Sequence, residues 1–286
     1  EGKGWQLYLL GRHKEALDAY EQALALNSTH AEWHNRKALV LRKLKQLEEA
    51  LLSHEQAISR SPNSSHLYTE KGVTLRDLKR YDEAFAAFEQ ALHLDPDSPH
   101  VYNERGMAFR ERRQYEKALA DLTKAIDIAP NYTDAYKEKG ITLSDNRQYE
   151  EAVAAFEQAL RLDSRYTEIY LRKGNALRKL RKYKEALDTY ESALRIDPTY
   201  RSVYNGMGHA FYHLNRNQEA VVAFQRAIEL GSNDSGSRAV MALALCRLAH
   251  YQEALAICEE VIHLAPSTTD AYLVNRGFGL ALSHFT

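Results

Sequence analysis

Residues 81–106 read YDEAFAAFEQALHLDPDSPHVYNERG, and residues 149–174 read YEEAVAAFEQALRLDSRYTEIYLRKG. The first stretch begins at position 81 and the second at position 149, so the offset is twice 34 positions. Self-similarity at a period of this size is typical of proteins that stack one small structural unit many times. The period therefore decides the fold, and we follow it through the rest of the chain.

Small residues mark the period along the whole sequence. Steps of one period reach only glycine or alanine, at Gly4, Ala38, Gly72, Gly106, Gly140, Gly174, Gly208 and Ala242. Twelve positions further on every residue is alanine, from Ala16 to Ala254. Five of the six prolines share another phase, at Pro62, Pro96, Pro130, Pro198 and Pro266. The spacing holds without insertion or deletion from residue 1 to about residue 270.

Each 34-residue unit is predicted to form two helices. In the unit 65–98, apolar residues near helical spacing predict a first helix over about 65–78 and a second over about 82–94, with a short turn at Lys79-Arg80. Pro96 ends the second helix because proline cannot continue one. A glycine inside a helix, such as Gly72, costs about 1 kcal/mol relative to alanine. We therefore expect a neighbouring helix to approach the chain closely at this phase.

The repeated unit resembles a known family. The motif of one unit is carried by Tyr102, Gly106, Phe109, Tyr115, Ala118, Ala125 and Pro130. This pattern resembles the tetratricopeptide repeat (TPR) and covers nearly the whole chain. The resemblance implies an all-α fold, a right-handed α-solenoid (superhelix) of stacked antiparallel helix pairs with a 34-residue period. Stacking is required because one helix pair cannot bury its own apolar face.

We expect residues 1–286 to form a single TPR solenoid. Its predicted parts are a partial repeat 1–30, full repeats 31–64, 65–98, 99–132, 133–166, 167–200, 201–234 and 235–268, and a C-terminal capping helix 269–286. The segment 231–237 is rich in Gly and Ser, which predicts a turn-rich opening to the last full repeat. The apolar segment 277–282 either caps the array or docks on another chain. End-to-end or C-terminal-helix-mediated self-association is therefore a further expectation.

The composition disfavours several classes of function. A net charge of −1 does not favour a global attraction to nucleic acid or to a membrane surface. Two cysteines, Cys246 and Cys258, argue against a disulfide framework and fit a reducing cytoplasm. No apolar run is long enough to span a membrane. The sequence holds no phosphate-binding loop, G-x-S-x-G, H-E-x-x-H or C-x-x-C motif, so we expect a non-enzymatic protein without a cofactor.

One cluster is a candidate metal site. His209 and His213 are one helical turn apart, and Cys246 falls in the next unit. In the family all three phases face the concave side, and two histidines with one cysteine are suitable ligands for Zn²⁺. The alternative is a partly exposed histidine pair beside a small apolar cysteine. We favour this alternative and expect no metal.

The resemblance implies a concave groove, lined by first helices, that binds a peptide or protein segment. By the family phase, the expected groove residues are Asn35, Leu39, Arg42, Val73, Arg76, Asn103, Met107, Arg110, Lys137, Ile141, Arg172, Asn175, Arg178 and Tyr212. An apolar line runs along the predicted floor at Leu39, Val73, Met107 and Ile141. Such a groove suits a peptide of mixed charge that is anchored by apolar side chains and held by arginine forks and asparagine amides.

The arginines of the groove have an alternative role. Arg42, Arg76 and Arg110 run parallel to the apolar line and are expected either to hold a ligand or to pair with glutamates of neighbouring units. Those glutamates are Glu70, Glu104 and Glu138.

Some members of the family clamp a C-terminal carboxylate with lysine and asparagine at fixed phases. Here Lys137 is followed by Ile141 where that pattern has asparagine, and Asn175 is preceded by Leu171 where it has lysine. The clamp is therefore incomplete in both units, which disfavours binding of a chaperone tail.

Three functions remain. The first is a non-enzymatic scaffold that binds a protein segment in its groove. The second is a ligand-sensing region of a larger multidomain signalling protein, such as a nucleotide-driven switch or a kinase. The third is binding of nucleic acid through the basic residues of units 31–64 and 167–200, which interleaved glutamates and the near-zero net charge disfavour.

Overall fold

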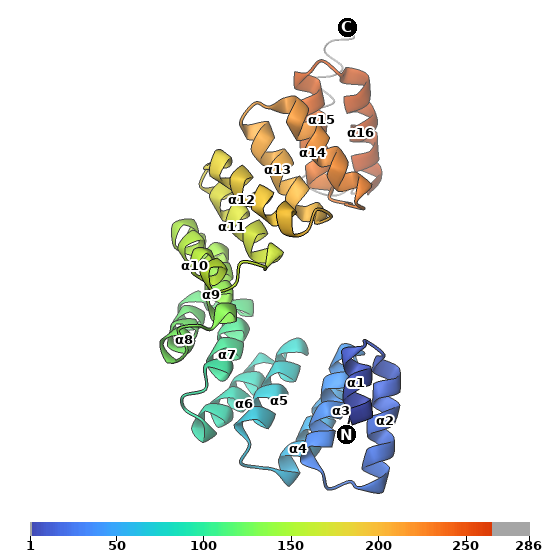
Figure 1. Ribbon diagram of the computed structural model, residues 1–286, viewed down its shortest axis with the longest axis vertical. Helices are drawn as coiled ribbons and strands as arrows, with labels where there is room; N and C mark the ends of the chain where they lie inside the picture. Colours follow the sequence, from blue (N-terminus) through green and yellow to red (C-terminus); the bar gives the residue numbers. More distant parts are fainter. Residues whose placement is uncertain (1, 265–286) are drawn as a thin grey trace. The chain divides into compact units, whose positions relative to one another are not determined.

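The computed structural model describes residues 2–264, and this part of the chain is all-α. Sixteen helices follow one another, joined by short turns, and the described residues contain no strand (Figure 1). The predicted all-α fold of paired helices is therefore confirmed. The predicted capping helix 269–286 lies outside the described residues.

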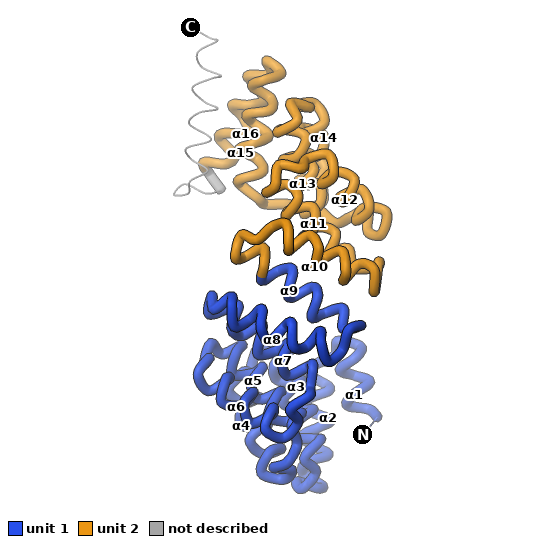
Figure 2. Tube along the Cα trace, turned by 90° about the vertical axis from the view of Figure 1, so that its left-hand side faces the viewer, with its two compact units in different colours: residues 1–142 blue, residues 143–286 orange. Residues whose placement is uncertain are grey.

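The chain forms two compact units, residues 1–142 and residues 143–286, coloured separately in Figure 2. Unit 1 contains α1 (Gly2–Leu9), α2 (His13–Leu26), α3 (Ala31–Lys43), α4 (Leu47–Arg60), α5 (Ser65–Asp77), α6 (Tyr81–Leu94), α7 (Pro99–Glu111), α8 (Tyr115–Ile128) and most of α9 (Thr133–Asp145). Unit 2 contains the end of α9, α10 (Tyr149–Leu162), α11 (Thr167–Lys179), α12 (Tyr183–Ile196), α13 (Arg201–His213), α14 (Asn217–Glu229), α15 (Ser235–Arg247) and α16 (Tyr251–Leu264). The single array over residues 1–286 stays a prediction.

Within each unit the helices pack in two layers. The two helices of a pair contact each other, as α5 and α6 do, and each second helix also packs on the next first helix, as α4 does on α5. First helices of successive pairs touch as well, α3, α5 and α7 in unit 1 and α11, α13 and α15 in unit 2. Among the described helices, no two second helices approach each other to the same extent. First helices therefore form the inner layer of each unit.

The turn inside each pair is a repeated helix-ending motif. Positive φ recurs at one phase of the repeat, at Gly11, Lys45, Lys79, Arg113, Arg147, Arg181, Asn215 and Ala249. At Lys79 (φ 63°) the N–H donates to the carbonyl of Arg76 at 2.8 Å, and the N–H of Arg80 donates to that of Leu75 at 2.9 Å. These bonds satisfy the last carbonyls of the first helix and reverse the chain. The turn predicted at Lys79-Arg80 is confirmed.

A bulky side chain of the second helix lies on each small residue of the first helix. A methyl group at Gly72 would stand 2.6 Å from the ring of Phe88, and one at Gly174 would stand 2.4 Å from the ring of Tyr190. Both rings are fully buried. Gly4, Gly106 and Gly208 meet the residue 16 positions later in the same way. The expected close approach at the glycine phase is thus a bulky side chain, in most cases an aromatic ring, packed on bare helix backbone.

Where the small residue is alanine, the partner is smaller. Ala38 and Ala242 carry a Cβ atom, and the residues 16 positions later are His54 and Cys258, both fully buried. Ala242 and Cys258 belong to one apolar cluster. Protein interiors are close-packed, so a methyl group gained on one helix has to be matched by volume lost on the other. The sequence analysis did not predict this contact.

Replacing Gly72 by alanine should destabilise the protein, and the effect should depend on Phe88. Overpacking costs about 1–3 kcal/mol, which exceeds the gain of about 1 kcal/mol from the helix propensity of alanine. In a Phe88→Leu background the ring is absent, and the same Gly72→Ala change should be neutral or stabilising. Urea unfolding of the four variants should give a coupling free energy of about 2 kcal/mol between the two positions.

Gly106 offers a matched control for this cycle. A methyl group there would stand 3.0 Å from Leu122, a wider and more deformable contact than the ring on Gly72. Gly106→Ala should therefore cost less than Gly72→Ala. Equal effects of Gly72→Ala with and without Phe88 would refute the packing account.

Candidate functional site

The three arginines of the inner layer of unit 1 are paired inside the protein. Each donates to the glutamate 28 residues later, and the distances are 2.9 Å for Arg42–Glu70, 2.7 Å for Arg76–Glu104 and 3.3 Å for Arg110–Glu138. Each pair joins one first helix to the next, from α3 through α5 and α7 to α9. We call these six residues the arginine–glutamate ladder. Of the two expected roles, the structure shows that these arginines pair with glutamates of the neighbouring repeats.

Arg76 is the most buried member of the ladder. Its side chain is 9% exposed, and that of Glu104 is 14% exposed. Asp77 and Glu111 each place a carboxylate oxygen 3.7 Å from its guanidinium group. Burial by itself opposes the charge, but the attraction of Glu104, Asp77 and Glu111 outweighs it and raises the pKa of Arg76. Arg76 is therefore a permanently charged group that holds three first-helix residues together.

Replacing Arg76 by methionine should destabilise the protein by about 2 kcal/mol, because a nearly buried carboxylate on Glu104 loses its partner. Arg80→Met is the matched control. Arg80 pairs with Glu83 at 2.6 Å, but both side chains are exposed (39% and 57%). Exposed pairs of this kind contribute less than about 1 kcal/mol. Urea unfolding curves should separate the two variants, and losses of similar size would contradict the assigned role of the ladder.

The apolar line of unit 1 is only partly accessible. Val73 and Ile141 are 5% and 6% exposed, whereas Leu39 and Met107 are half-buried. Met107 also contacts the ladder, with its sulfur 3.8 Å from Nη1 of Arg76. Apolar contact with a ligand in this unit would therefore come from Leu39 and Met107.

The remaining expected groove residues of unit 1 are also engaged. Asn35 and Asn103 are almost fully buried, and the amide nitrogen of Asn35 lies 3.4 Å from Nε2 of His66. Lys137 donates to Asp134 at 2.9 Å. The side-chain carbonyl oxygens of Asn35 and Asn103 are buried and have no hydrogen-bond partner among the described residues.

A buried histidine lies behind the ladder. His54 on α4 is fully buried, and neither ring nitrogen has a hydrogen-bond partner among the described residues. Burial, assisted by the charges of Arg42, His66 and Lys71, lowers the pKa of His54 from 6.5 to about 3. The ring is therefore neutral at pH 7. As the pH falls, His54 gains its proton at a higher pH in the unfolded chain than in the folded protein.

The pKa of His54 predicts a loss of stability in mild acid. Between pH 6.5 and pH 3 the unfolded state binds the extra proton, so the free energy of unfolding falls as the pH falls. Lowering the pH from 7 to 5 should cost about 2 kcal/mol through this residue alone. The double variant Ala38→Gly/His54→Phe restores the glycine–ring pairing without a titrating group, and should lose about that much less stability over the same interval.

Urea unfolding at pH 7 and pH 5 measures this difference. His93→Gln removes an exposed histidine on α6 and serves as the control substitution. An unchanged pH dependence in the double variant would show that His54 does not titrate as assigned.

Unit 2 contains a polar pocket on its inner layer. The pocket has a volume of about 420 Å³ and is lined by Leu171, Asn175, Arg178, Arg201, Ser202, Asn205, Gly206, His209, Ser232, Asn233, Asp234 and Ser237. Its walls come from α11, α13 and the loop that leads into α15. Asn175 and Arg178 were expected groove residues. Arg201 and the loop residues were missed, because a Gly- and Ser-rich loop indicates a turn and does not by itself indicate a site.

Hydrogen bonds hold the walls of this pocket in place. The hydroxyl of Tyr190 donates to Oδ1 of Asn175 at 2.8 Å, and burial raises the pKa of Tyr190 to about 12, so the donor stays protonated. The amide nitrogen of Asn205 donates to Oγ of Ser232 at 2.9 Å. Asp234 accepts from the backbone N–H of Ser237 at 3.2 Å and caps α15. The polar groups are therefore oriented before any ligand arrives.

The candidate metal ligands do not converge. His209 lies 3.3 Å from Oγ of Ser237, and burial together with nearby positive charge lowers the pKa of His209 to about 4. His213 stacks on Tyr183 with ring centroids 4.9 Å apart, and Cys246 is buried. Over the described part of the chain, no three His, Cys, Asp or Glu side chains are grouped as metal ligands would be.

The last two expected groove residues lie on the inner helices of unit 2. Arg172 pairs with Glu168 on its own helix at 2.7 Å, and both side chains are exposed. The guanidinium group of Arg247 lies 4.1 Å from the ring centre of Tyr212. An exposed pair within one helix exchanges readily with solvent, so Arg172 is the more available of the two for a ligand.

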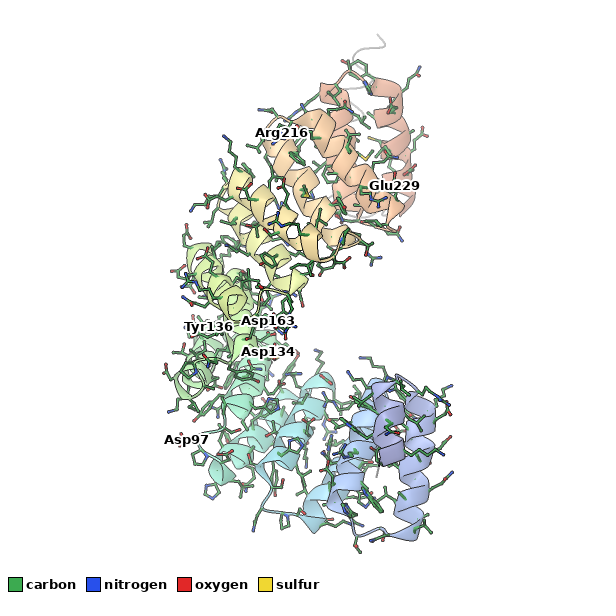
Figure 3. The ribbon with its side chains drawn as sticks, in the orientation of Figure 1. Asp97, Asp134, Tyr136, Asp163, Arg216 and Glu229 are labelled. Carbon is green, nitrogen blue, oxygen red and sulfur yellow. The ribbon has the colours of Figure 1, made fainter. Side chains whose placement is uncertain are left out.

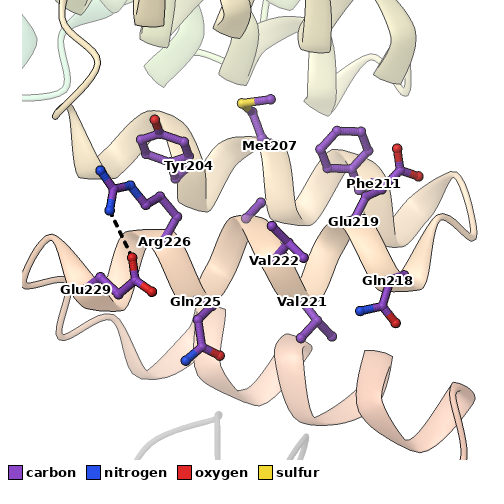
Figure 4. Close-up of a pocket in the computed structure, with 11 residues that line it drawn as sticks. Tyr204, Met207, Phe211, Gln218, Glu219, Val221, Val222, Gln225, Arg226 and Glu229 are labelled. Atoms are coloured by element: carbon purple, nitrogen blue, oxygen red, sulfur yellow. Dashed lines mark hydrogen bonds and ion pairs between the residues drawn. The ribbon is translucent and has the colours of Figure 1, made fainter.

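A second pocket lies on another face of the same helices. It has a volume of about 670 Å³ and is mainly apolar, with Tyr204, Met207 and Phe211 from α13 facing Val221 and Val222 from α14 (Figure 4). Arg226 and Glu229 form an ion pair of 2.9 Å at its rim. Glu229 is the last residue of α14 and is labelled in Figure 3. Because α13 turns different residues toward the two pockets, they open on different faces of unit 2.

Sequence comparison gives the family. Profiles described as tetratricopeptide repeat match residues 2–65, 74–137, 137–201 and 202–234. The chain belongs to the tetratricopeptide repeat family. The resemblance drawn from the repeated motif is therefore confirmed. A comparison with curated protein sequences gives no significant match for this TPR protein.

Solved structures show the same fold. The TPR protein is similar to PilF of Pseudomonas aeruginosa, at 18% identity and a TM-score of 0.63 over 72% of this chain and 94% of that one. It is similar to the Cut9–Hcn1 hetero-tetramer of the APC/C, at 15% identity and 0.67 over 96% and 54%. It is also similar to yeast Tom70, at 18% identity and 0.62 over 95% and 59%. The chain thus spans little more than half of the last two, and these likenesses concern the fold alone.

The helices of the TPR protein are short. Within residues 2–264, no helix is long and apolar enough to cross a lipid bilayer.

Proposed function

We propose that this TPR protein is a non-enzymatic interaction scaffold that binds a peptide or protein segment of mixed charge along its inner layer of first helices. The observation that carries this proposal is the contrast between the two units. In unit 1 the arginines are neutralised by the ladder, whereas in unit 2 the same layer opens into a polar pocket. Its polar side chains are held by hydrogen bonds within the unit.

Each unit offers its own kind of contact to a bound segment. Half-buried Leu39 and Met107 offer apolar contact in unit 1 without exposing a large hydrophobic patch. Arg172, Asn175 and Arg178 offer polar contact in unit 2. Recognition of this kind uses a few anchoring side chains on a rigid groove.

A protein of similar fold supports the proposal. Cut9 is found with Hcn1 in a hetero-tetramer, so one protein of this fold assembles with a different chain. We extend that behaviour to this protein only as part of the proposal. The alternative of a ligand-sensing region in a larger signalling protein would use the same inner layer, and it stays a prediction.

Changes to the inner layer should remove a captured partner, whereas equal changes to the outer surface should not. Met107→Glu and Leu39→Glu introduce a charge on the inner layer of unit 1. Leu52→Glu and Val222→Glu introduce the same charge on second helices, at side chains that are each 60% exposed. In affinity capture, with folding checked by circular dichroism, the inner variants should weaken partner binding at least about tenfold, which is about 1.4 kcal/mol.

The outer variants are the controls and should bind as the parent chain does. Capture that survives both inner variants but fails with Val222→Glu would move the binding site to the apolar pocket on α13 and α14. That outcome would refute the proposed use of the inner layer.

A further inference from the structure

The arginine–glutamate ladder is interrupted in unit 2. Arg178 stands at the phase of Arg110, two repeats further along the chain. In unit 1 the glutamate of each ion pair stands 28 positions after the arginine. The equivalent position for Arg178 is residue 206, which is glycine. Among residues 2–264, no carboxylate is paired with Arg178. Its guanidinium group interacts with the hydroxyl of Tyr190, and its buried Nε has no hydrogen-bond partner. At this position the repeat therefore keeps the arginine of the ion pair and lacks the glutamate.

Tyr190 explains why glutamate is absent from this rung. Its ring lies against Gly174 and also reaches Gly206, where a methyl group would stand 2.6 Å from Cζ and 2.8 Å from the hydroxyl oxygen. No side chain fits at residue 206 while Tyr190 is in place. The same hydroxyl donates to Oδ1 of Asn175. The tyrosine that completes the core of this pair thus keeps the glutamate out and orients the neighbouring amide.

The space left by the missing glutamate is part of the polar pocket. Arg178, Asn175 and Gly206 all line this cavity of about 420 Å³. A guanidinium group presents a planar fork of donors that matches a carboxylate. Because Oδ1 of Asn175 already accepts from Tyr190, the amide nitrogen of Asn175 remains to donate to a ligand.

The charge balance of the pocket favours an anion. Arg178 and Arg201 are both cationic, and Asp234 is the one acidic side chain among the residues that line the cavity. Asp234 is occupied at the start of α15, where it accepts from both the backbone N–H and the hydroxyl of Ser237. Arg201 donates to the carbonyl of Gly231 at 3.4 Å, in the loop that also carries Asp234. One further negative charge would balance the site.

We propose that the polar pocket binds a carboxylate of the ligand, with Arg178 and Asn175 as the donors, at the place where the ladder has its glutamate in unit 1. This inference rests on the proposed function, since the carboxylate is carried by the bound peptide, on an acidic side chain or at its C-terminus. The site differs from the lysine–asparagine clamp of other family members, because Leu171 stands at the lysine position.

Small probes test this pocket without knowledge of the partner. The full chain, labelled with ¹⁵N, is titrated with N-acetylglutamate α-amide, which has a side-chain carboxylate, and with N-acetylalanine, which has a terminal one. N-acetylglutamine α-amide is the neutral control. We expect an acidic probe to shift the side-chain amide signals of Asn175 and Asn205, with millimolar affinity. The neutral probe should bind at least about tenfold more weakly.

The variants locate the binding energy. Arg178→Gln should weaken the acidic probe at least about tenfold, whereas Arg110→Gln, at the same phase in unit 1, should leave it unchanged. Should Arg178→Gln fail to fold, Arg178→Lys keeps the charge, loses the planar fork and should still weaken binding measurably. The acidic probe that shifts the signals more strongly identifies the source of the carboxylate.

Three results would overturn the inference: equal binding of the neutral probe, tighter binding of inorganic phosphate than of either carboxylate, or unchanged binding in a folded Arg178 variant. The test is independent of the capture experiment. A captured partner with no probe response refutes the carboxylate pocket and leaves the scaffold standing. A response at the pocket without a captured partner refutes the scaffold and leaves the carboxylate pocket standing.

Discussion

The packing of a bulky side chain on a small residue of the partner helix is the contact on which the structure depends. Where Gly72 has no Cβ atom, the ring of Phe88 rests on the helix backbone, and Tyr190 rests on Gly174 in the same way. This contact sets the distance between the two helices of a pair. Since interiors are close-packed, volume added on one helix has to be removed from the other. The alanine–cysteine combination of Ala242 and Cys258 follows that rule.

Equal spacing of the pairs has a consequence for the inner layer. First helices that follow at a constant interval bring equivalent side chains of successive repeats into contact, which allows one ion pair to recur from pair to pair. Removing charges from water is unfavourable unless they are paired. The ladder satisfies this condition in unit 1. In unit 2 the packing contact and the ion pair compete for the same space, because Tyr190 covers the backbone of Gly206. The core contact prevails, and a polar pocket takes the place of the ion pair.

Much of the fold was predictable from the sequence because its signals are local and repeated. Helix ranges such as 65–78 agree with α5 (Ser65–Asp77), and the turn at Lys79-Arg80 lies where the spacing placed it. The site was predictable only in outline. The phase of Arg76 places it on the inner layer, yet the choice between a ligand and Glu104 depends on a distance of 2.7 Å between two helices. The loop residues Ser232, Asn233 and Asp234 were missed because they lie in a loop before α15 that the consensus phase does not describe.

The sequence by itself determined the repeating unit, its helical content, its family and the positions that must remain small, because each of these follows from periodic residue types within a single repeat. Only the tertiary structure decided which ring fills each small position, which arginines are already neutralised and where the inner layer is left open. The physical reason is that these properties depend on volume and charge shared between different helices. Arg178 and Arg110 stand at the same position in their repeats. They differ in the residues of the neighbouring helices around them, which for Arg178 lie on α12 and α13.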